Sequence, residues 1–221
     1  MSFNFSIVLK YQDALLLGLW TTLKLTLICI VLGCVLGFLL ALARTSKSAV
    51  LRGVSSVYVE FFRGTPVLVQ LFWIFFCLPL VLGFELSNLA SGVIALTLYM
   101  GAISSETFRA SLKSVGREQL DACVALGLSP FTRTTHVVLP QAILRAAPTL
   151  LSNCVSLFKE SALVSAVGMA DLMFVGQNIS NNTARPIEVL TVVALIYFVI
   201  AFPLTRAVTL IEHRILKRLA V

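Results

Sequence analysis

Ionisable residues stand inside two apolar stretches of this sequence, where they are candidates for binding or acid–base chemistry. Glu106 and Arg109 are three residues apart, and Lys159 and Glu160 are neighbours. An ionisable residue inside a bilayer is costly unless it is paired or hydrated, and it usually lines a pathway. Together the two pairs offer both signs of charge, which suits a ligand that carries an ammonium and a carboxylate.

The spacing within each pair indicates which partners it needs. Glu106 and Arg109 lie at i and i+3 of a helix, so an ordinary ion pair at the membrane interface is one interpretation. Lys159 and Glu160 project about 100° apart on a helix and cannot pair with each other. The stretch "KES" therefore favours an interrupted helix whose backbone faces a cavity. The sharper hypothesis places all four charged side chains in one polar cavity.

Catalysis is an alternative that the rest of the sequence does not favour. The buried carboxylates are able to do acid–base chemistry, but neither a nucleophile–base pair nor a metal-ligand set accompanies them, and His136 and His213 stand alone. A membrane enzyme and a proton-coupled secondary transporter stay open as alternatives. The five cysteines are scattered singly, which is typical of core packing rather than of a metal site: Cys29, Cys34, Cys77, Cys123 and Cys154.

The composition is that of an integral membrane protein. Of 221 residues, 58% are hydrophobic and 12% are charged, and the mean hydropathy is +0.97. The net charge is +7. In a membrane protein, the distribution of Lys and Arg between the two sides of the membrane is more informative than their total, so a nucleic-acid partner is not expected. The start of the chain lacks a basic segment followed by an apolar one, so we expect no signal peptide.

The elements that must position these charges are about five transmembrane helices in a single domain, residues 1–221. Uncharged runs long enough to cross a bilayer predict spans at about 22–43, 64–84, 86–108, 142–170 and 189–209. In the first span, Gly33 and Gly37 have the spacing of a close helix contact. The fold class is therefore all-α.

Basic residues predict the orientation of these spans. The segments after the first, third and fifth spans are rich in Lys and Arg, whereas the opposite segments hold only Lys10, Lys24 and Arg185. Because Lys and Arg favour the cytoplasmic side, the N-terminus is expected outside and the C-terminus inside. The polar loop 111–140 then faces the cytoplasm.

This loop predicts two short helices. Residues 114–127 form the first, in which Arg117 and Asp121 are spaced to pair and Gly127 is a natural C′ residue. Ser129 caps the second, which we expect to end before Pro140. Neither helix is long enough to be stable alone in water, so both pack on their own spans or in a groove of another protein.

The loop resembles the "EAA" loop of the permease subunits of binding-protein-dependent ABC importers, which reads EAA-x3-G-x9-I-x-LP. Here Asp121 stands for Glu and Cys123 for the second Ala. Asp keeps the charge on a side chain one methylene shorter, and Cys is small enough to replace Ala. The resemblance implies that the loop docks on an ATPase through a set of matching residues: Asp121, Ala122, Cys123, Gly127, Leu139 and Pro140.

Two further stretches, "FFRGTPVLVQLFWIFF" and "VVLPQAILRAAPTLLSNCVSLFKESALVSAVG", resemble the polar-amino-acid branch of these permeases. The resemblance implies the type I ABC importer permease fold in a bacterial inner membrane, and a substrate site between the third and fourth spans. The candidate substrate-binding residues are Ser105, Glu106, Arg109, Lys159, Glu160 and Ser161.

The same resemblance implies the partners. They are a second permease subunit, identical or paralogous, two cytoplasmic ATP-binding subunits and an extracytoplasmic solute-binding protein. This chain has no phosphate-binding Gly loop, so we expect no cofactor in it, and ATP and Mg²⁺ belong to the partner ATPase. The amino acid that is carried is left open.

Residues 63–66 before the second predicted span are a candidate gate or packing element, with plain helix capping as the alternative: Arg63, Gly64, Thr65 and Pro66. Gln70 within that span either lines a pathway or bonds a neighbouring helix.

Overall fold

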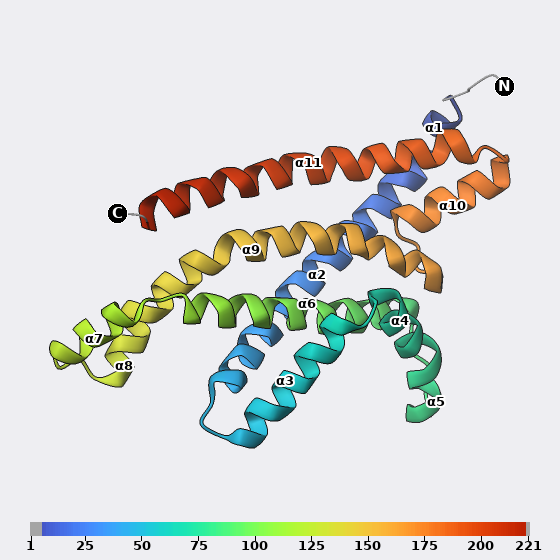
Figure 1. Ribbon diagram of the computed structural model, residues 1–221. Helices are drawn as coiled ribbons and strands as arrows, with labels where there is room; N and C mark the ends of the chain where they lie inside the picture. The colour runs from blue at the N-terminus through green and yellow to red at the C-terminus, as the bar shows by residue number, and fades with distance from the viewer. Residues whose placement is uncertain (1–5, 220–221) are drawn as a thin grey trace.

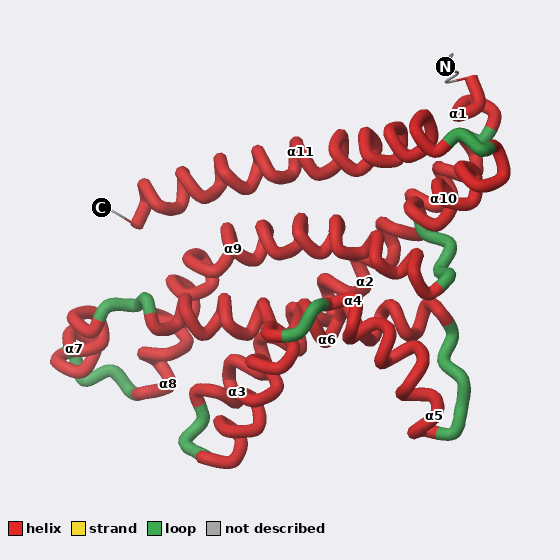
Figure 2. The backbone as a smooth tube through the Cα atoms, turned by 45° about the vertical axis from the view of Figure 1, so that its right-hand side comes forward, coloured by secondary structure: helices red, strands yellow, loops and turns green. Residues whose placement is uncertain are grey.

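The computed structural model describes residues 6–219, with side chains from residue 7 to residue 215, and all elements in this part of the chain are helical (Figure 1, Figure 2). The all-α prediction is confirmed. The helices are α1 (Ser6–Lys10), α2 (Gln12–Thr45), α3 (Ala49–Gly64), α4 (Val67–Phe72), η1 (Trp73–Cys77), α5 (Leu78–Leu82), α6 (Asn88–Lys113), α7 (Arg117–Ala125), α8 (Pro130–Thr132), η2 (Arg133–Val138), α9 (Leu139–Glu160), η3 (Ser161–Val167), α10 (Leu172–Thr183) and α11 (Pro186–Leu219).

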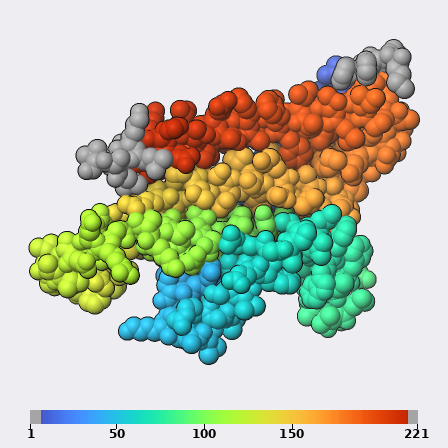
Figure 3. Space-filling view, viewed as in Figure 1, coloured from blue at the N-terminus to red at the C-terminus, as the bar shows by residue number. Residues whose placement is uncertain are grey.

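Within the described residues, four helices are long and apolar enough to cross a membrane. They are α2, α6, α11 and the continuous rod from α8 to η3. A fifth span results if α3 and the helix over Val67–Leu82 count as one, and these two are bent by 107° at the break between them. The loop of α7 and α8 projects at one end of the molecule, which we call the loop end (Figure 3).

Helices α2 and α6 form the closest contact in the fold. A Cβ atom on Gly33 would lie 2.5 Å from the Met100 side chain, and one on Gly37 would lie 2.6 Å from that of Ser104. Gly101 of α6 receives Leu36 in the same way, at 2.7 Å. The close contact predicted at Gly33 and Gly37 is therefore confirmed. Small residues let two backbones approach where hydrocarbon surroundings provide no hydrophobic driving force.

The main apolar core is built around this pair. Side chains from α2, α4, α6 and α9 meet in it, and the largest that are fully buried are Leu25, Leu71, Leu96, Met100 and Leu157. A smaller cluster, which includes Leu15, Leu172 and Val193, joins the start of α2 to α10 and α11. The far ends of the bundle are thus packed separately from its middle.

The second loop helix does not end before Pro140, so that prediction is wrong. Val138 keeps helical angles, with φ −75° and ψ −50°, and the chain runs on from Pro130 through η2 into α9. η2 is a π-helical stretch, as is η1 ahead of Pro79. A wider turn accommodates proline by relieving the clash of its ring with the preceding turn. The part of the polar loop from Pro130 onward is therefore continuous with the rod that crosses the membrane.

A buried group of hydrogen-bonded polar side chains joins α2, α10 and α11 at the end of the bundle opposite the loop end. The Asp171 side chain is fully buried and caps α10 by accepting a hydrogen bond from the Phe174 N–H at 2.9 Å. Tyr197 of α11 donates to its second oxygen at 3.4 Å, and Thr22 of α2 accepts from the Leu172 N–H at 3.0 Å. Three helices are tied together here. Burial raises the pKa of Asp171 to about 6.

We expect Asp171→Asn to change the pH dependence of stability. The carboxyl ionises near pH 4 in an unfolded chain and at about 6 in the folded one, so its contribution to stability falls as pH rises between these values. Asparagine keeps an oxygen for the Phe174 N–H and does not ionise. Melting temperatures in detergent should therefore rise for the variant relative to wild type from pH 4 to 6 and then level. A constant difference across this range would contradict the assignment.

Candidate functional site

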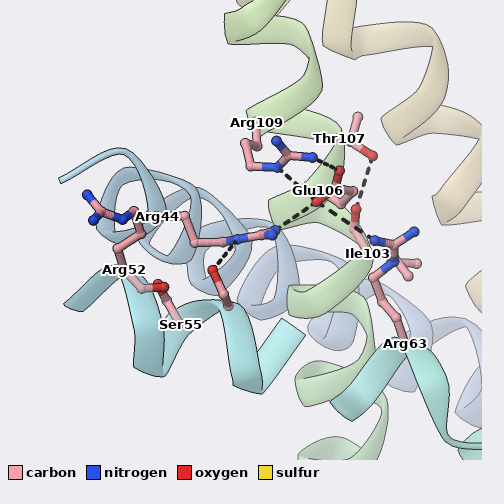
Figure 4. A network of polar contacts seen from close by, with 9 residues as sticks. Arg44, Arg52, Ser55, Arg63, Ile103, Glu106, Thr107 and Arg109 are labelled. Carbon is pink, nitrogen blue, oxygen red and sulfur yellow. Dashed lines mark hydrogen bonds and ion pairs between the residues drawn. The ribbon is translucent and has the colours of Figure 1, made fainter. Parts of the chain in front are cut away.

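Glu106 is the centre of an ion-pair cluster near the loop end (Figure 4). Arg44, from the end of α2, donates to Glu106 Oε2 at 2.7 Å, and Arg109 Nε donates to the same oxygen at 3.0 Å. Arg109 also bonds Oε1 through Nη2. Arg63, from the end of α3, approaches Oε2 at 3.7 Å. The predicted pair of Glu106 and Arg109 is confirmed, and it belongs to a larger group that joins three helices.

The cluster holds three guanidinium groups and one carboxylate, so its charge is unbalanced. Both oxygens of Glu106 are already bonded to arginine, so its negative charge is more than balanced by neighbouring guanidinium groups and attracts an added ammonium little. The guanidinium groups offer five N–H donors each, more than one carboxylate can use. The cluster is therefore suited to an anion rather than to a cation.

Lys159 and Glu160 lie on different sides of α9, as their adjacent positions require. Lys159 is exposed and lines a cavity of about 330 Å³ beside α10 and α11, with Met173, Val193 and Tyr197. Glu160 is half-buried and interacts electrostatically with Tyr99 of α6. Within residues 7–215, neither forms an ion pair.

The helix changes where "KES" predicted an interruption. α9 ends at Glu160, and the chain continues as the tighter 3₁₀ helix η3 until Gly168, which has φ +75°. The predicted interruption is therefore wrong, because the helix tightens at Ser161 but runs on unbroken to Val167. Ser161 begins η3, and its buried hydroxyl donates to the Phe158 carbonyl at 2.8 Å. Ser105 is also buried and lies against Gly37 of α2.

Helices α6 and α9 run antiparallel and side by side (Figure 1, Figure 2). Three contacts fix their alignment: Tyr99 with Glu160, Thr107 with Asn153 at 3.1 Å, and Ser114 with Arg145. The cluster at Glu106 therefore lies two helical turns along α6 from Glu160, roughly 10 Å at 1.5 Å per residue.

One face of α9 is polar along this seam. Thr149, Ser152, Ser156 and Glu160 follow one another at spacings of three and four residues, which places them on the same side of the helix. They are exposed or half-buried. Their hydroxyl groups make no hydrogen bond within the described side chains, whereas Thr107, Thr134 and Thr183 bond their own helix. We call this face the polar stripe.

The break at Gly64-Thr65-Pro66 separates α3 from α4, as predicted. The Gln70 side chain, 5% exposed, donates to the Phe62 carbonyl at 2.9 Å and to the Thr65 carbonyl at 3.0 Å. It bonds the backbone that the break leaves unpaired, at the end of the neighbouring helix α3. Helix α3 itself was not predicted, although Ser48 caps it and an apolar face recurs along it at Val50, Val54, Val57 and Phe61.

The loop helix α7 ends as the sequence predicted. Gly127 has φ +68°, its N–H donates to Val124 O at 2.9 Å, and the Leu128 N–H donates to Cys123 O at 3.0 Å, which is the Schellman arrangement. Cys123 is buried, while Asp121 and Ala122 are exposed. The expected ion pair of Arg117 with Asp121 is not formed. Leu139 is half-buried and Pro140 exposed, at the start of α9.

The α7–α8 loop also presents apolar side chains to its surroundings. Val124, Leu126 and Phe131 are 60%, 76% and 75% exposed. Apolar side chains gathered on a projecting loop mark a surface for another protein. The fold therefore defines a protein with several membrane-spanning helices and, between two of them, a projecting α7–α8 loop with an apolar surface.

Comparison with known proteins identifies the class. Residues 33–217 match the family described as binding-protein-dependent transport system inner membrane component, and the chain belongs to this family. It is a permease subunit of the ABC transporter class and not an enzyme. Family membership implies a separate ATPase and a solute-binding protein as partners.

Similar proteins are found across bacteria. A protein of Rickettsia conorii named as a glutamine transport system permease is 35% identical over 90% of this chain and 91% of its own length. The arginine transport system permease protein ArtQ of Bacillus subtilis is 32% identical over 97% and 98%. A crystal structure of an amino acid ABC transporter with histidines matches with a TM-score of 0.92 and 34% identity, over 97% of this chain and all of that one.

Replacement of Gln70 by Leu should destabilise the bend. Leucine fills a similar volume but leaves the carbonyl groups of Phe62 and Thr65 buried and unpaired, at a cost of about 1–3 kcal/mol for each such group. We expect a lower melting temperature in detergent for Gln70→Leu than for Val69→Leu, an exposed neighbour on α4. Equal melting temperatures would show that the bend does not depend on Gln70.

Two arginines of the cluster should differ in their importance for stability. The Arg44 side chain is 10% exposed and bonds Glu106 at 2.7 Å, whereas Arg63 is 47% exposed and 3.7 Å away. We expect Arg44→Gln to cost about 1.5–3 kcal/mol, as for a hydrogen bond to a charged group, and Arg63→Gln less than about 1 kcal/mol, as for an exposed pair. Thermal melting of the two variants measures the order, and a reversed order would contradict it.

Proposed function

We propose that this chain is the transmembrane subunit of an ATP-driven importer that carries polar amino acids across a bacterial inner membrane. The names of the similar proteins support this substrate class, since they transport glutamine and arginine or are described with histidines. The observation that carries the proposal is the polar stripe on α9, a helix that crosses the membrane; the hydroxyl groups and the carboxylate of the stripe form no hydrogen bond or ion pair within residues 7–215.

The stripe offers a substrate a series of weak polar contacts. Serine and threonine hydroxyls both donate and accept, so they can replace water around an ammonium or a carboxylate without holding it tightly. A second permease subunit, identical or related, covers the stripe in the assembled transporter and excludes lipid from it. The pathway then lies between α6, α9 and this second subunit.

Two charged binding positions, one at Glu160 and one at Arg109, lie along this pathway. Glu160, the only acid on the stripe, binds the α-ammonium of the substrate, with Lys159 beside it at the narrowing of the helix. Arg109 lies two turns along α6, held by Glu106, and its remaining N–H groups meet the α-carboxylate. Ser105 and Ser161 support the two helices from inside, because one faces α2 and the other bonds its own backbone. The substrate passes from one binding position to the next.

The loop end faces the cytoplasm in this proposal, with the C-terminus inside and the N-terminus outside. The distribution of Lys and Arg supports this orientation. Two ATP-binding subunits, which hold ATP and Mg²⁺, grip the α7–α8 loop through Asp121, Ala122 and the exposed apolar side chains. An extracytoplasmic binding protein delivers the substrate at the other end. Arg63, with the break at Gly64-Thr65-Pro66, forms a gate element beside the cluster.

Uptake by proteoliposomes tests the proposal. The permease, its ATPase and its binding protein are reconstituted, and uptake of radiolabelled polar amino acids is measured with and without ATP on the side of the ATPase. We expect uptake to require ATP and to persist when a protonophore removes the proton gradient. Uptake that survives without ATP and stops with the protonophore would instead support a secondary transporter.

In the same assay, Glu160→Gln should lower uptake at least tenfold, because the amide carries no charge to pair with the substrate ammonium. Co-purification with the ATPase should be unchanged, since Glu160 is distant from the loop. Glu212→Gln, at an exposed position of α11, is the matched control and should transport normally. Normal uptake by the Glu160 variant would remove this residue from the substrate site.

A further inference from the structure

Arg145 makes a contact that closes the docking loop at its base. Its Nη1 donates to the carbonyl oxygen of Ser114 and also lies 3.3 Å from Ser114 Oγ. The two residues are 31 positions apart, and all of α7, α8 and η2 lies between them. This contact joins the C-cap residue of α6 directly to α9, which is part of the rod that crosses the membrane.

The Ser114 carbonyl is a group that needs such a partner. Ser114 is the C-cap of α6, and its own N–H donates to Ala110 O at 3.0 Å. The last carbonyls of a helix have no intrahelical donor, and the negative end of the helix dipole lies there. Arginine supplies both the donor and the positive charge. The hydroxyl of Ser114 bonds Ser111 O at 2.8 Å, which fixes the residue in place.

The geometry makes α6 and α9 respond to the loop together. Because Pro130–Glu160 is one continuous rod, a displacement of α8 tilts α9 without any further joint. Helix α6 has no such rod, since it reaches α7 through Val115 and Gly116. Arg145 bridges this non-helical connection, and α6 then carries α2 with it through their glycine contacts.

The bridge leaves one donor of Arg145 unpaired. The Nε atom of Arg145 is buried and has no hydrogen-bond partner among the described side chains. A buried donor that stays unpaired costs free energy, so this arrangement of Arg145 is held by Ser114 against a penalty. Such a contact suits a joint that must change between two packed arrangements.

We propose that Arg145 is a positioning residue that passes the movement of the docking loop to α6 as well as to α9. It touches neither substrate nor nucleotide. Without it, the ATPase still grips the loop and moves α9, but α6 no longer follows, and hydrolysis is uncoupled from translocation. This inference rests on the proposed function.

The test measures uptake per ATP hydrolysed in the reconstituted complex. We expect Arg145→Ala to keep ATP hydrolysis within about twofold of wild type and to lower uptake per ATP at least tenfold. Arg145→Lys, which keeps a charge and a donor, should restore most of the ratio, and Arg145→Gln should lie between. Arg214→Ala, which removes an exposed charge near the same end, is the matched control and should behave as wild type.

The outcomes are distinguishable. A wild-type complex without ATP-dependent uptake would refute the proposed function itself. If wild type transports and all Arg145 variants share its ratio, the positioning role is refuted. If Arg145→Ala does not assemble, the test uses the complexes with Arg145→Lys and Arg145→Gln. We expect a higher uptake per ATP hydrolysed for Arg145→Lys than for Arg145→Gln. Equal values for these two variants overturn the proposal.

Discussion

Inside a bilayer no water is available to backbone groups, so every interruption of a helix must be satisfied by the protein itself. This chain interrupts its helices repeatedly, and a local device accompanies several of these interruptions. Gln70 bonds the carbonyls released at the 107° bend. π-helical stretches precede Pro79 and Pro140, and the Asn88 side chain donates to Val167 O at 2.7 Å where η3 ends. At each of these places a side chain or a wider helical turn accommodates the irregular backbone.

These devices divide the molecule into parts with different freedom. Helices α2 and α6 meet through glycines with no room for an added methyl group, and the arginines of α2 and α3 bind the same carboxylate on α6. By contrast, α9 and α11 line open cavities with α2 and α10, so they are packed less tightly there. A transporter needs both properties, since a stiff unit must move against a looser one for access to alternate.

Much of the candidate site was accessible from the sequence because its signals are local. The pair of Glu106 with Arg109 follows from a spacing of three residues, and the Gly127 cap follows from a glycine placed directly after a predicted helix. The convergence of Arg44 and Arg63 on Glu106 was not accessible, because it depends on how α2 and α3 fold back onto α6. Helix α3 was missed since its charges exclude it as a span. Pro140 was misjudged because propensity for an α-helix says nothing of a π turn.

The two acidic residues of the site show why residue type alone does not assign a role. Glu106 and Glu160 are both carboxylates within apolar helices, and both were equal candidates for binding an ammonium. The structure distinguishes them by their counter-ions. Three arginines lie around Glu106, and its ion pairs with them join three helices. Glu160 has no cationic partner among the described side chains, and this is why we propose Glu160, and not Glu106, as the group that meets a cationic part of a ligand.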